Sequence, residues 1–302
     1  MKVAALVVTW NSAETIGRCL VAAAGAARST PLELHVWDNA SGDLTSALAL
    51  AHVPDHRVVR SPANVGFARA VNELAARTDA DALLLLNPDA YLEAGAIDRL
   101  AAAVRDGAAI AGGRLSGPGG EVQPACARPY PSAWRLAWWL ATRRRPSWRI
   151  PTASAEVDAV SGAFMLVSRA AWDAAAGLDT AYPHSGEDLD LCWRVKQSGG
   201  CVVFVPAARA VHELEASVRQ APAEIDVLRW LGTVRFARRK DGRAAALALR
   251  ATLALQTSAL LLARAFRLPA ARGRDVVRAG LLWRWAVLNA VPPLPSTVKE
   301  RP

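Results

Sequence analysis

Short apolar runs alternate with segments of helical periodicity through the first half of the chain. The apolar runs predict strands at Lys2–Thr9, Leu32–Asp38, Val58–Arg60, Ala82–Leu86 and Ala109–Gly113. The segments between them predict helices near Ala13–Ala27, Leu44–Leu50, Ala68–Arg77 and Ala94–Val104. Regular alternation of strand and helix is typical of β-α-β units. We therefore expect an α/β fold with a mostly parallel sheet flanked by helices.

The second half of the chain has a less regular pattern. It predicts strands near Ala155–Val160, Ala163–Ser168 and Val202–Val205, and a helix between Ser185 and Gly199. Beyond Val218 the pattern is helical to about Trp285, and we expect the last dozen residues to form a loose tail. We therefore expect a domain over residues 1–218, with halves 1–115 and 116–218, followed by a helical extension over residues 219–302.

Polar residues follow the first four predicted strands. They are Thr9-Trp10-Asn11, Asp38-Asn39, Asn64-Val65-Gly66 and Asn87-Pro88-Asp89. A mostly parallel sheet binds its ligands beyond the carboxyl ends of its strands. These four segments are therefore where we expect a binding site.

Asp89 stands at the open end of the apolar strand Ala82–Leu86. One or two carboxylates together with phosphate oxygens are typical ligands of Mg²⁺ or Mn²⁺, and such a cation offsets the charge of a departing nucleotide diphosphate. Asn87-Pro88-Asp89 is also an ordinary turn at the end of a strand. From the residues alone, both interpretations stay open.

Three acids, Glu187, Asp188 and Asp190, stand in the first turn of a predicted helix. The helix dipole favours acids there by about 0.3–1 kcal/mol each, so they need no further function. Three acids in four residues nevertheless exceed what capping requires. A carboxylate beside a sugar donor can remove the proton of an attacking hydroxyl group, and Asp188 is the candidate for this base.

The other polar positions each have a structural and a functional interpretation. Asp38-Asn39 forms either an Asx-turn or a hydrogen-bonding site for a pyrimidine ring. Gly66 allows close approach of a ligand to the start of a helix, on which Arg69 either reaches a diphosphate or lies on the surface. His212 is either a structural histidine or a ligand of the cation.

The formal net charge of +9 is concentrated at the C-terminal end of the chain. Residues 219–302 contain sixteen Lys and Arg against five Asp and Glu, whereas residues 1–218 contain twenty against twenty-two. A basic, apolar extension suits an anionic membrane surface. The sequence has no zinc finger, RNP-like motif or basic heptad region, so we expect no nucleic-acid partner.

The cysteines and the first residues bear on the compartment. The four cysteines are scattered without a C-x-x-C pair, which predicts reduced, buried thiols. The N-terminal apolar run leads into Thr9-Trp10-Asn11 instead of a small-residue cleavage site, so we interpret it as a buried strand. We expect a cytoplasmic protein that lies peripherally on the inner face of the cell membrane.

Two segments bear on the membrane question. Tyr130–Trp148 carries tryptophans at helical spacing and then three arginines, a pattern explained by core packing, by a membrane interface or by contact with a polyprenyl diphosphate. Ala244–Ala263 is apolar but is interrupted by Arg250 and Gln256. We therefore expect it to form an amphipathic helix on the membrane or on the rest of the protein, not a spanning helix.

Six motifs, taken in order, resemble the family 2 glycosyltransferases, most closely the rhamnosyltransferase-like members. They are Val7-Val8-Thr9-Trp10-Asn11, Asp38-Asn39-Ala40-Ser41, Asn64-Val65-Gly66-Phe67-Ala68, Leu86-Asn87-Pro88-Asp89, Ser161-Gly162-Ala163-Phe164-Met165 and Glu187-Asp188-Leu189-Asp190-Leu191-Cys192-Trp193-Arg194. The resemblance covers roughly residues 1–218. It implies a GT-A fold with a Rossmann-like sheet, a nucleotide-diphosphate sugar donor, Mg²⁺ or Mn²⁺, and inversion at the anomeric carbon.

The resemblance also implies a role for each matching residue. Asp188 is the base, Asp89 and His212 bind the metal, and Gly162, Ala163 and Glu187 contact the acceptor. The donor is contacted by Thr9, Asn11, Asp38, Asn39, Asn64, Gly66, Arg69 and Asn87. The implied donor is dTDP-rhamnose, or otherwise a UDP-sugar or another nucleotide sugar. The implied acceptor is a hydroxyl group of a cell-wall or polysaccharide precursor, which the basic tail suggests is lipid-linked.

The sequence departs from the family pattern at two places. Glu215 stands where members often have a glycine three residues after the histidine. Asp226-Val227-Leu228-Arg229-Trp230 lacks the glutamine of the Q-x-x-R-W motif of processive relatives, so we expect addition of a single sugar. Two alternatives are a catalytically inactive nucleotide-sugar-binding scaffold and another nucleotide-using enzyme. Asp89 and Asp188 argue against the first, and the lack of a G-x-G-x-x-G phosphate loop argues against the second.

Overall fold

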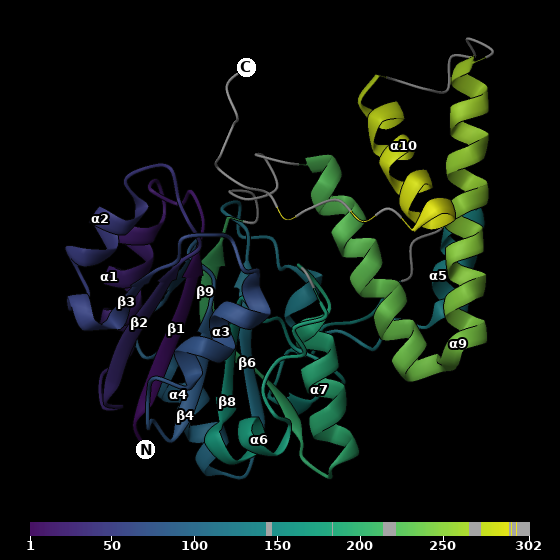
Figure 1. Cartoon of the computed structure of the whole chain (residues 1–302). Helices are drawn as coiled ribbons and strands as arrows, with labels where there is room; N and C mark the ends of the chain where they lie inside the picture. Colours follow the sequence, from purple (N-terminus) through teal and green to yellow (C-terminus); the bar gives the residue numbers. More distant parts are fainter. Residues whose placement is uncertain are drawn as a thin grey trace.

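One mixed sheet runs through the centre of the protein and is flanked by helices (Figure 1). The structure is a computed structural model that describes residues 1–142, 147–182, 184–213, 222–265, 273–289, 291 and 294. Within these residues the strand order is β3-β2-β1-β4-β8-β6-β9-β5, and β7 pairs with β9. Most of the paired residues belong to parallel ladders, as the sequence pattern predicts.

The N-terminal half of the sheet is entirely parallel, and its predicted strands are confirmed. They are β1 (Val3–Thr9), β2 (Leu32–Asp38), β3 (Val58–Arg60) and β4 (Ala82–Leu86). The predicted helices correspond to α1 (Ile16–Ala26), α2 (Thr45–Leu50), α3 (Phe67–Ala75) and α4 (Ala96–Arg105). Strands β1 and β4 are buried on both faces, which explains their unbroken apolar sequences.

The C-terminal half of the sheet adds antiparallel strands. Its strands are β5 (Ala90–Leu92), β6 (Ile110–Ser116), β7 (Ala155–Glu156), β8 (Phe164–Ser168) and β9 (Val202–His212). Strand β7 is shorter than predicted, and β5 is not predicted at all. Strand β9 is longer than predicted because its pairing with β6 resumes after a register shift and because its end also pairs with β5. His212 is consequently the last residue of a strand.

Helices α6 (Arg169–Ala174) and α7 (Glu187–Gln197) follow β8 along the chain. The third acid of α7, Asp190, is fully buried. Its carboxylate accepts hydrogen bonds from Tyr182 Oη (3.1 Å), Arg194 Nε (2.7 Å) and Arg239 Nη1 (2.7 Å). A buried carboxylate with three donors is a structural element, and losing a partner from such a group is costly. Asp190 therefore joins α7 to the C-terminal helices.

Three helices form a second apolar cluster beside the sheet (Figure 1). They are α5 (Ala133–Thr142), α9 (Pro222–Ala265) and α10 (Gly273–Leu288). Helix α9 changes direction at Gly242, whose φ of 91° is not helical. Among the described helices, α9 is long and apolar enough to cross a membrane, with 28% of its most apolar window buried. The helical extension predicted for this part of the chain is confirmed over these residues.

Parts of the sequence predictions lie outside the described residues. The predicted boundary between 218 and 219 falls within residues 214–221, and the three arginines after α5 fall within residues 143–146. Nearly all of the predicted C-terminal tail also lies outside them. All four thiols are free, as predicted, and Cys19, Cys126 and Cys192 are buried, whereas Cys201 is only partly buried.

Gly113 of β6 gives a test of the packing between sheet and core. A Cβ atom at this position would overlap the ring of Phe164 and approach the backbone oxygen of Ala208 to 2.8 Å. We expect Gly113→Ala to lower the free energy of unfolding by about 1–3 kcal/mol or more, because overpacking forces neighbouring groups to move. Chemical denaturation measures this change.

Gly25, an exposed glycine of α1, provides the matched control. A Cβ atom there would meet nothing within 4 Å, and the backbone conformation is helical. We expect Gly25→Ala to raise the free energy of unfolding by about 0.5–1 kcal/mol. Equal stability of the two variants would contradict the close packing at Gly113.

Candidate active site

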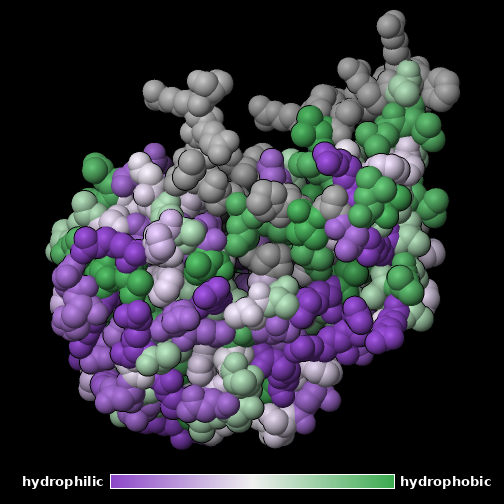
Figure 2. Space-filling view, viewed as in Figure 1, coloured by the Kyte–Doolittle hydropathy of each residue, from purple (hydrophilic) through white to green (hydrophobic). Residues whose placement is uncertain are grey.

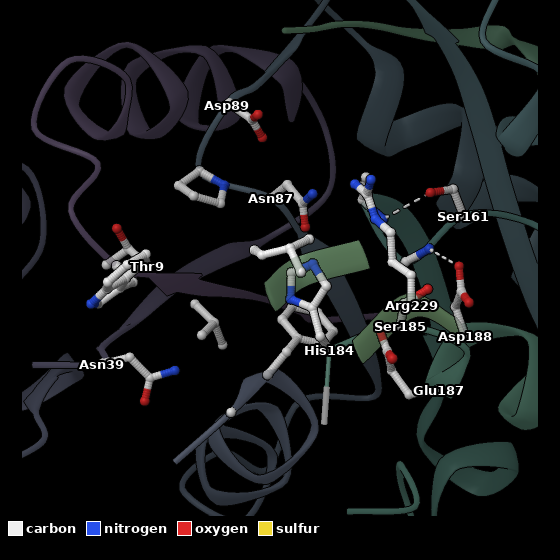
Figure 3. A pocket seen from close by; sticks show the side chains of 18 of the residues that line it. Thr9, Asn39, Asn87, Asp89, Ser161, His184, Ser185, Glu187, Asp188 and Arg229 are labelled. Atoms are coloured by element: carbon white, nitrogen blue, oxygen red, sulfur yellow. Dashed lines mark hydrogen bonds between the residues drawn. The ribbon is translucent and has the colours of Figure 1, made fainter. Parts of the chain in front are cut away.

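A cavity of about 330 Å³ opens beyond the carboxyl ends of β1 and β4 (Figure 3). It is lined by most of the residues singled out in the sequence: Thr9, Asn39, Asn64, Gly66, Asn87, Asp89, Gly162, Ala163, Glu187, Asp188 and His212. In Figure 3, Thr9 and Asn39 lie at one end, Asn87 and Asp89 lie near the middle, and Glu187 and Asp188 lie at the other end. The cavity therefore brings together residues from both halves of the sheet.

Thr9 and Asn39 form one end of the cavity. The Thr9 hydroxyl group is buried and has no hydrogen-bond partner in the described part of the chain. The Asn39 Oδ1 atom accepts hydrogen bonds from the Trp37 indole (3.0 Å) and from the Val65 backbone N–H (3.1 Å). These bonds fix the amide so that its nitrogen points into the cavity (Figure 3). Both side chains therefore offer polar groups to a ligand.

Asn64 and Gly66 line the same side of the cavity. Gly66 has a φ of 83° and immediately precedes α3, so a ligand can closely approach the first N–H groups of this helix. The Asn64 side chain accepts a hydrogen bond from the Gly66 backbone N–H (3.0 Å) and holds this turn. Arg69 is exposed on α3 and does not line the cavity.

Asp38 and Asn11 hold a turn beside the cavity without lining it. The Asp38 carboxylate accepts hydrogen bonds from the Ser41 backbone N–H (3.0 Å), the Ser41 hydroxyl group and the Ser46 hydroxyl group. Asn11 Oδ1 accepts a hydrogen bond from the Gly42 backbone N–H (2.9 Å). Asp38 therefore holds the turn that follows β2, and its contact with a pyrimidine ring stays a prediction.

The middle of the cavity is formed by Asp89 and His212, which the sheet brings together. Ala90 of β5 pairs with His212 of β9, so the carboxylate just before β5 meets the imidazole at the end of β9. His212 Nε2 lies 3.2 Å from Asp89 Oδ1 and 3.2 Å from Asn87 Nδ2. The two strands therefore place a carboxylate oxygen beside an imidazole nitrogen at the cavity wall.

Gln123 fixes the orientation of the His212 ring. Its Nε2 donates a hydrogen bond to the His212 carbonyl oxygen (2.7 Å), which leaves its Oε1 facing His212 Nδ1 at 2.9 Å. In the neutral ring Nδ1 therefore carries the proton, and Nε2 presents its lone pair to Asp89. A neutral imidazole held in this way is a typical metal ligand.

Asp89 and His212 fit a divalent cation. Two atoms that bind one cation at about 2.1 Å and at right angles lie about 3 Å apart, close to the observed separation of Oδ1 and Nε2. No group of three or more His, Cys, Asp or Glu side chains suited to a metal occurs within the described residues. A cation at this position would need further oxygen ligands, such as the phosphate oxygens of a bound nucleotide.

Asp188 lies at the far end of the cavity and is held by three donors. Its Oδ2 atom accepts hydrogen bonds from Arg128 Nη2 (2.9 Å) and from the Gly162 backbone N–H (3.3 Å). Its Oδ1 atom accepts from the Leu189 backbone N–H (2.7 Å). A Cβ atom on Gly162 would lie 3.4 Å from the Asp188 Cβ atom, so Gly162 packs directly against Asp188.

Glu187 stands beside Asp188 at the start of α7. Burial and the neighbouring Asp188 carboxylate raise the pKa of the Glu187 carboxyl group well above its ordinary value. Its Oε2 atom is buried and lacks a hydrogen-bond partner among the described residues. A buried, unpartnered carboxyl group at a cavity wall is a candidate contact for a ligand.

Several residues of the cavity are not among those predicted from the sequence. Arg128, Ser161, His184, Ser185 and Arg229 line it, and Gln123 orients His212. Ser161 belongs to one of the six motifs, and Arg229 belongs to the near match with Q-x-x-R-W. No local pattern identifies Arg128 or Gln123, because their partners lie 60 and 89 residues away along the chain.

Solved structures show which fold this arrangement belongs to. GalNAc-T7 with UDP, GalNAc and Mn²⁺ matches with a TM-score of 0.62 at 14% identity, covering 99% of this chain and 59% of that chain. The mannosyltransferase PcManGT from Pyrobaculum calidifontis, in complex with GDP-Man and Mn²⁺, matches with a TM-score of 0.52 at 18% identity. That match covers 95% of this chain and 86% of the other. The expected GT-A fold is confirmed.

Sequence comparisons show the family. The family model described as glycosyltransferase-like family 2 matches residues 2–233. An N-acetylglucosaminyl-diphospho-decaprenol L-rhamnosyltransferase from Mycobacterium tuberculosis is 31% identical over 242 residues, which are 72% of this chain and 77% of that protein. The chain therefore belongs to glycosyltransferase family 2 and is a glycosyltransferase that uses a nucleotide-sugar donor.

Proposed function

We propose that this enzyme transfers L-rhamnose from dTDP-rhamnose to a hydroxyl group of a lipid-linked cell-wall or polysaccharide precursor, with inversion at the anomeric carbon. The observation that carries the proposal is the single cavity that holds Asp89 and His212 between Thr9 and Asn39 at one end and Asp188 at the other. The mycobacterial relative, whose name gives a rhamnosyl transfer to a decaprenol-linked sugar, supports this choice of donor and acceptor. A UDP-sugar or another nucleotide sugar is the alternative donor.

The donor lies along the cavity from Thr9 towards Asp188 in this proposal. Thr9 and Asn39 supply hydrogen bonds to the nucleotide, and the backbone at Asn64 and Gly66 approaches it closely. Asn87, which lies between Thr9 and Asp188 in Figure 3, would contact the donor between its nucleotide and its sugar. The side chains of Asn11, Asp38 and Arg69 do not line the cavity. In this proposal they therefore support the donor site indirectly.

Asp89 and His212 are the residues that would hold the cation, Mg²⁺ or Mn²⁺. When bound there, the cation would stabilise the negative charge that develops on the departing nucleotide diphosphate. Gln123 keeps His212 in the orientation that this role needs. The Mn²⁺ bound in GalNAc-T7 and in PcManGT supports the proposal.

Asp188 acts as the general base. Its carboxylate takes the proton of the acceptor hydroxyl group while the hydroxyl oxygen forms a bond to the anomeric carbon. The bond from that carbon to the diphosphate oxygen breaks, and attack from the opposite face inverts the configuration. Gly162, Ala163 and Glu187 form the acceptor side of the cavity, and Arg128 positions the Asp188 carboxylate.

The metal assignment can be tested by donor binding. We expect Mn²⁺ to strengthen the binding of dTDP-rhamnose to the wild-type protein. We expect Asp89→Ala to lose this effect, because its affinity for the cation should fall by about 10–100-fold. Titration calorimetry with and without Mn²⁺ measures both, and UDP-sugars tested in parallel identify the nucleotide. Asp106→Ala, which removes an exposed acid outside the cavity, is the control. An unchanged effect of Mn²⁺ in Asp89→Ala would refute the assignment.

The role of Asp188 can be separated from donor binding. We expect Asp188→Asn to lower kcat by about 10²–10⁴-fold, because asparagine cannot accept the proton. The Kd for the donor should stay within about twofold, since Asn keeps the shape of the side chain. Release of the nucleotide diphosphate in the presence of a polyprenyl-diphosphate-linked sugar measures turnover. Loss of donor binding together with turnover would indicate a structural role instead.

Helices α5, α9 and α10 are proposed to lie on the inner face of the cell membrane. Large apolar side chains are exposed on all three helices: Trp134, Trp138, Leu247, Leu255, Leu262, Val277, Val287 and Leu288. Figure 2 shows hydrophobic side chains gathered over α9 and α10, whereas the surface over the sheet domain is mainly hydrophilic. Exposed apolar groups on helices that also expose Arg243, Arg278 and Arg284 suit the interface of an anionic bilayer.

Flotation with vesicles tests this surface. We expect the full chain to float with vesicles that contain phosphatidylglycerol, and Leu255→Glu to weaken vesicle binding by about tenfold, because a charge replaces a leucine that inserts between lipids. Leu255 is 73% exposed. Leu44, which is 69% exposed at the start of α2 on the far side of the molecule, provides the control Leu44→Glu. Equal loss in the two variants would argue against a specific surface.

A further inference from the structure

A second cavity of about 370 Å³ adjoins the active site on the side of Asp188. The loop before α5, the first turns of α5 and Trp148 form its walls. Arg128 lines both cavities, and its guanidinium group donates to the Asp188 carboxylate at 2.9 Å. This second cavity, which we call the aromatic groove, therefore begins where the acceptor hydroxyl group must lie.

The walls of the aromatic groove are mainly apolar and are fixed in place. Trp139 stacks on Trp230 of α9 with ring centroids 6.0 Å apart. The Trp148 indole N–H donates a hydrogen bond to the Ala127 carbonyl oxygen at 2.9 Å. Tyr130 packs against Phe236 with ring centroids 5.7 Å apart. The volume of the aromatic groove falls within the range of about 300–1,000 Å³ that is usual for small-molecule sites.

The charged side chains that line the groove are two arginines. Arg128 and Arg135 are the charged residues that line it, and both are cationic. A ligand that suits the groove therefore carries an anionic group close to an apolar body. A nucleotide or a free sugar offers too little apolar surface to cover these aromatic walls.

We propose that the aromatic groove binds the isoprenoid chain of the acceptor, next to its diphosphate. This inference rests on the proposed function, which places a lipid-linked acceptor at Asp188. Arg128 and Arg135 would contact the diphosphate, and Leu136, Trp139 and Trp148 would contact the first isoprene units. The groove lies on α5, which also exposes Trp134 and Trp138 of the proposed membrane surface, so the rest of the chain has a short path to the bilayer.

Binding of farnesyl diphosphate tests the groove directly. The full chain is titrated with farnesyl diphosphate and with inorganic diphosphate, in buffer free of divalent cations so that the donor site does not hold the diphosphate. We expect farnesyl diphosphate to bind at least tenfold more tightly. Trp148→Ala should reduce this preference by about tenfold, since a buried aromatic contact commonly contributes that much to binding.

Two further variants keep the result interpretable. Trp138→Ala removes an exposed tryptophan of the same helix that does not line the groove, and it should leave the preference unchanged. Leu136→Gln should reduce the preference as Trp148→Ala does, and thermal melting shows whether each variant is folded. Equal binding of the two diphosphates, or equal loss in Trp138→Ala, would overturn the proposal.

Turnover separates this inference from the proposed function. With two acceptors that carry the same sugar diphosphate, one esterified to a methyl group and one to a farnesyl chain, Trp148→Ala should lower kcat/KM about tenfold for the farnesyl acceptor only. Equal loss for both acceptors would overturn the groove assignment and leave the proposed function intact. If the wild type transfers sugar to neither acceptor, the proposed function fails, while the titration with farnesyl diphosphate still decides whether the groove binds an isoprenoid chain.

Discussion

The pairing of β4 with β8 joins the two halves of the sheet, and the site depends on it. Leu86 pairs with Phe164, and the ladder continues as the Asn87 backbone N–H donates to the Ala163 carbonyl oxygen at 3.1 Å. This contact brings the end of the parallel half, which carries Asp89, next to the turn that holds Asp188 through Gly162. A shift of this register by one residue would move every side chain of β8 to the opposite face.

The parallel half could be predicted from the sequence because local sequence patterns specify its strands. Strands buried on both faces are continuous apolar runs, as in Leu83–Leu86, and polar residues stand where each run ends. Since ligands bind beyond the carboxyl ends of parallel strands, Thr9, Asn39, Asn87 and Asp89 could be placed in one cavity in advance. In the other half, the acids at the start of a predicted helix indicated Asp188, and the family resemblance added Gly162.

The remainder of the site depends on contacts that no local pattern records. Gln123 orients His212 across 89 residues, and Arg128 reaches Asp188 across 60. Strand β5 has three residues and became recognisable only through its pairing with β9. The hydrogen bonds that the Ser41 and Ser46 hydroxyl groups donate to Asp38 could not be predicted either, since they depend on the fold of the turn after β2.

The ion pair between the buried Asp190 and Arg239 makes the helical extension and the sheet domain mutually dependent. Asp190 belongs to the same helix as Glu187 and Asp188, whereas Arg239 belongs to the first half of α9, and Phe236 of α9 packs in the main core. A chain that ended before α9 would lose one cation from a carboxylate with no access to water. A truncation ahead of α9 would therefore do more than remove the extension, because it would weaken the support of the helix that carries Glu187 and Asp188.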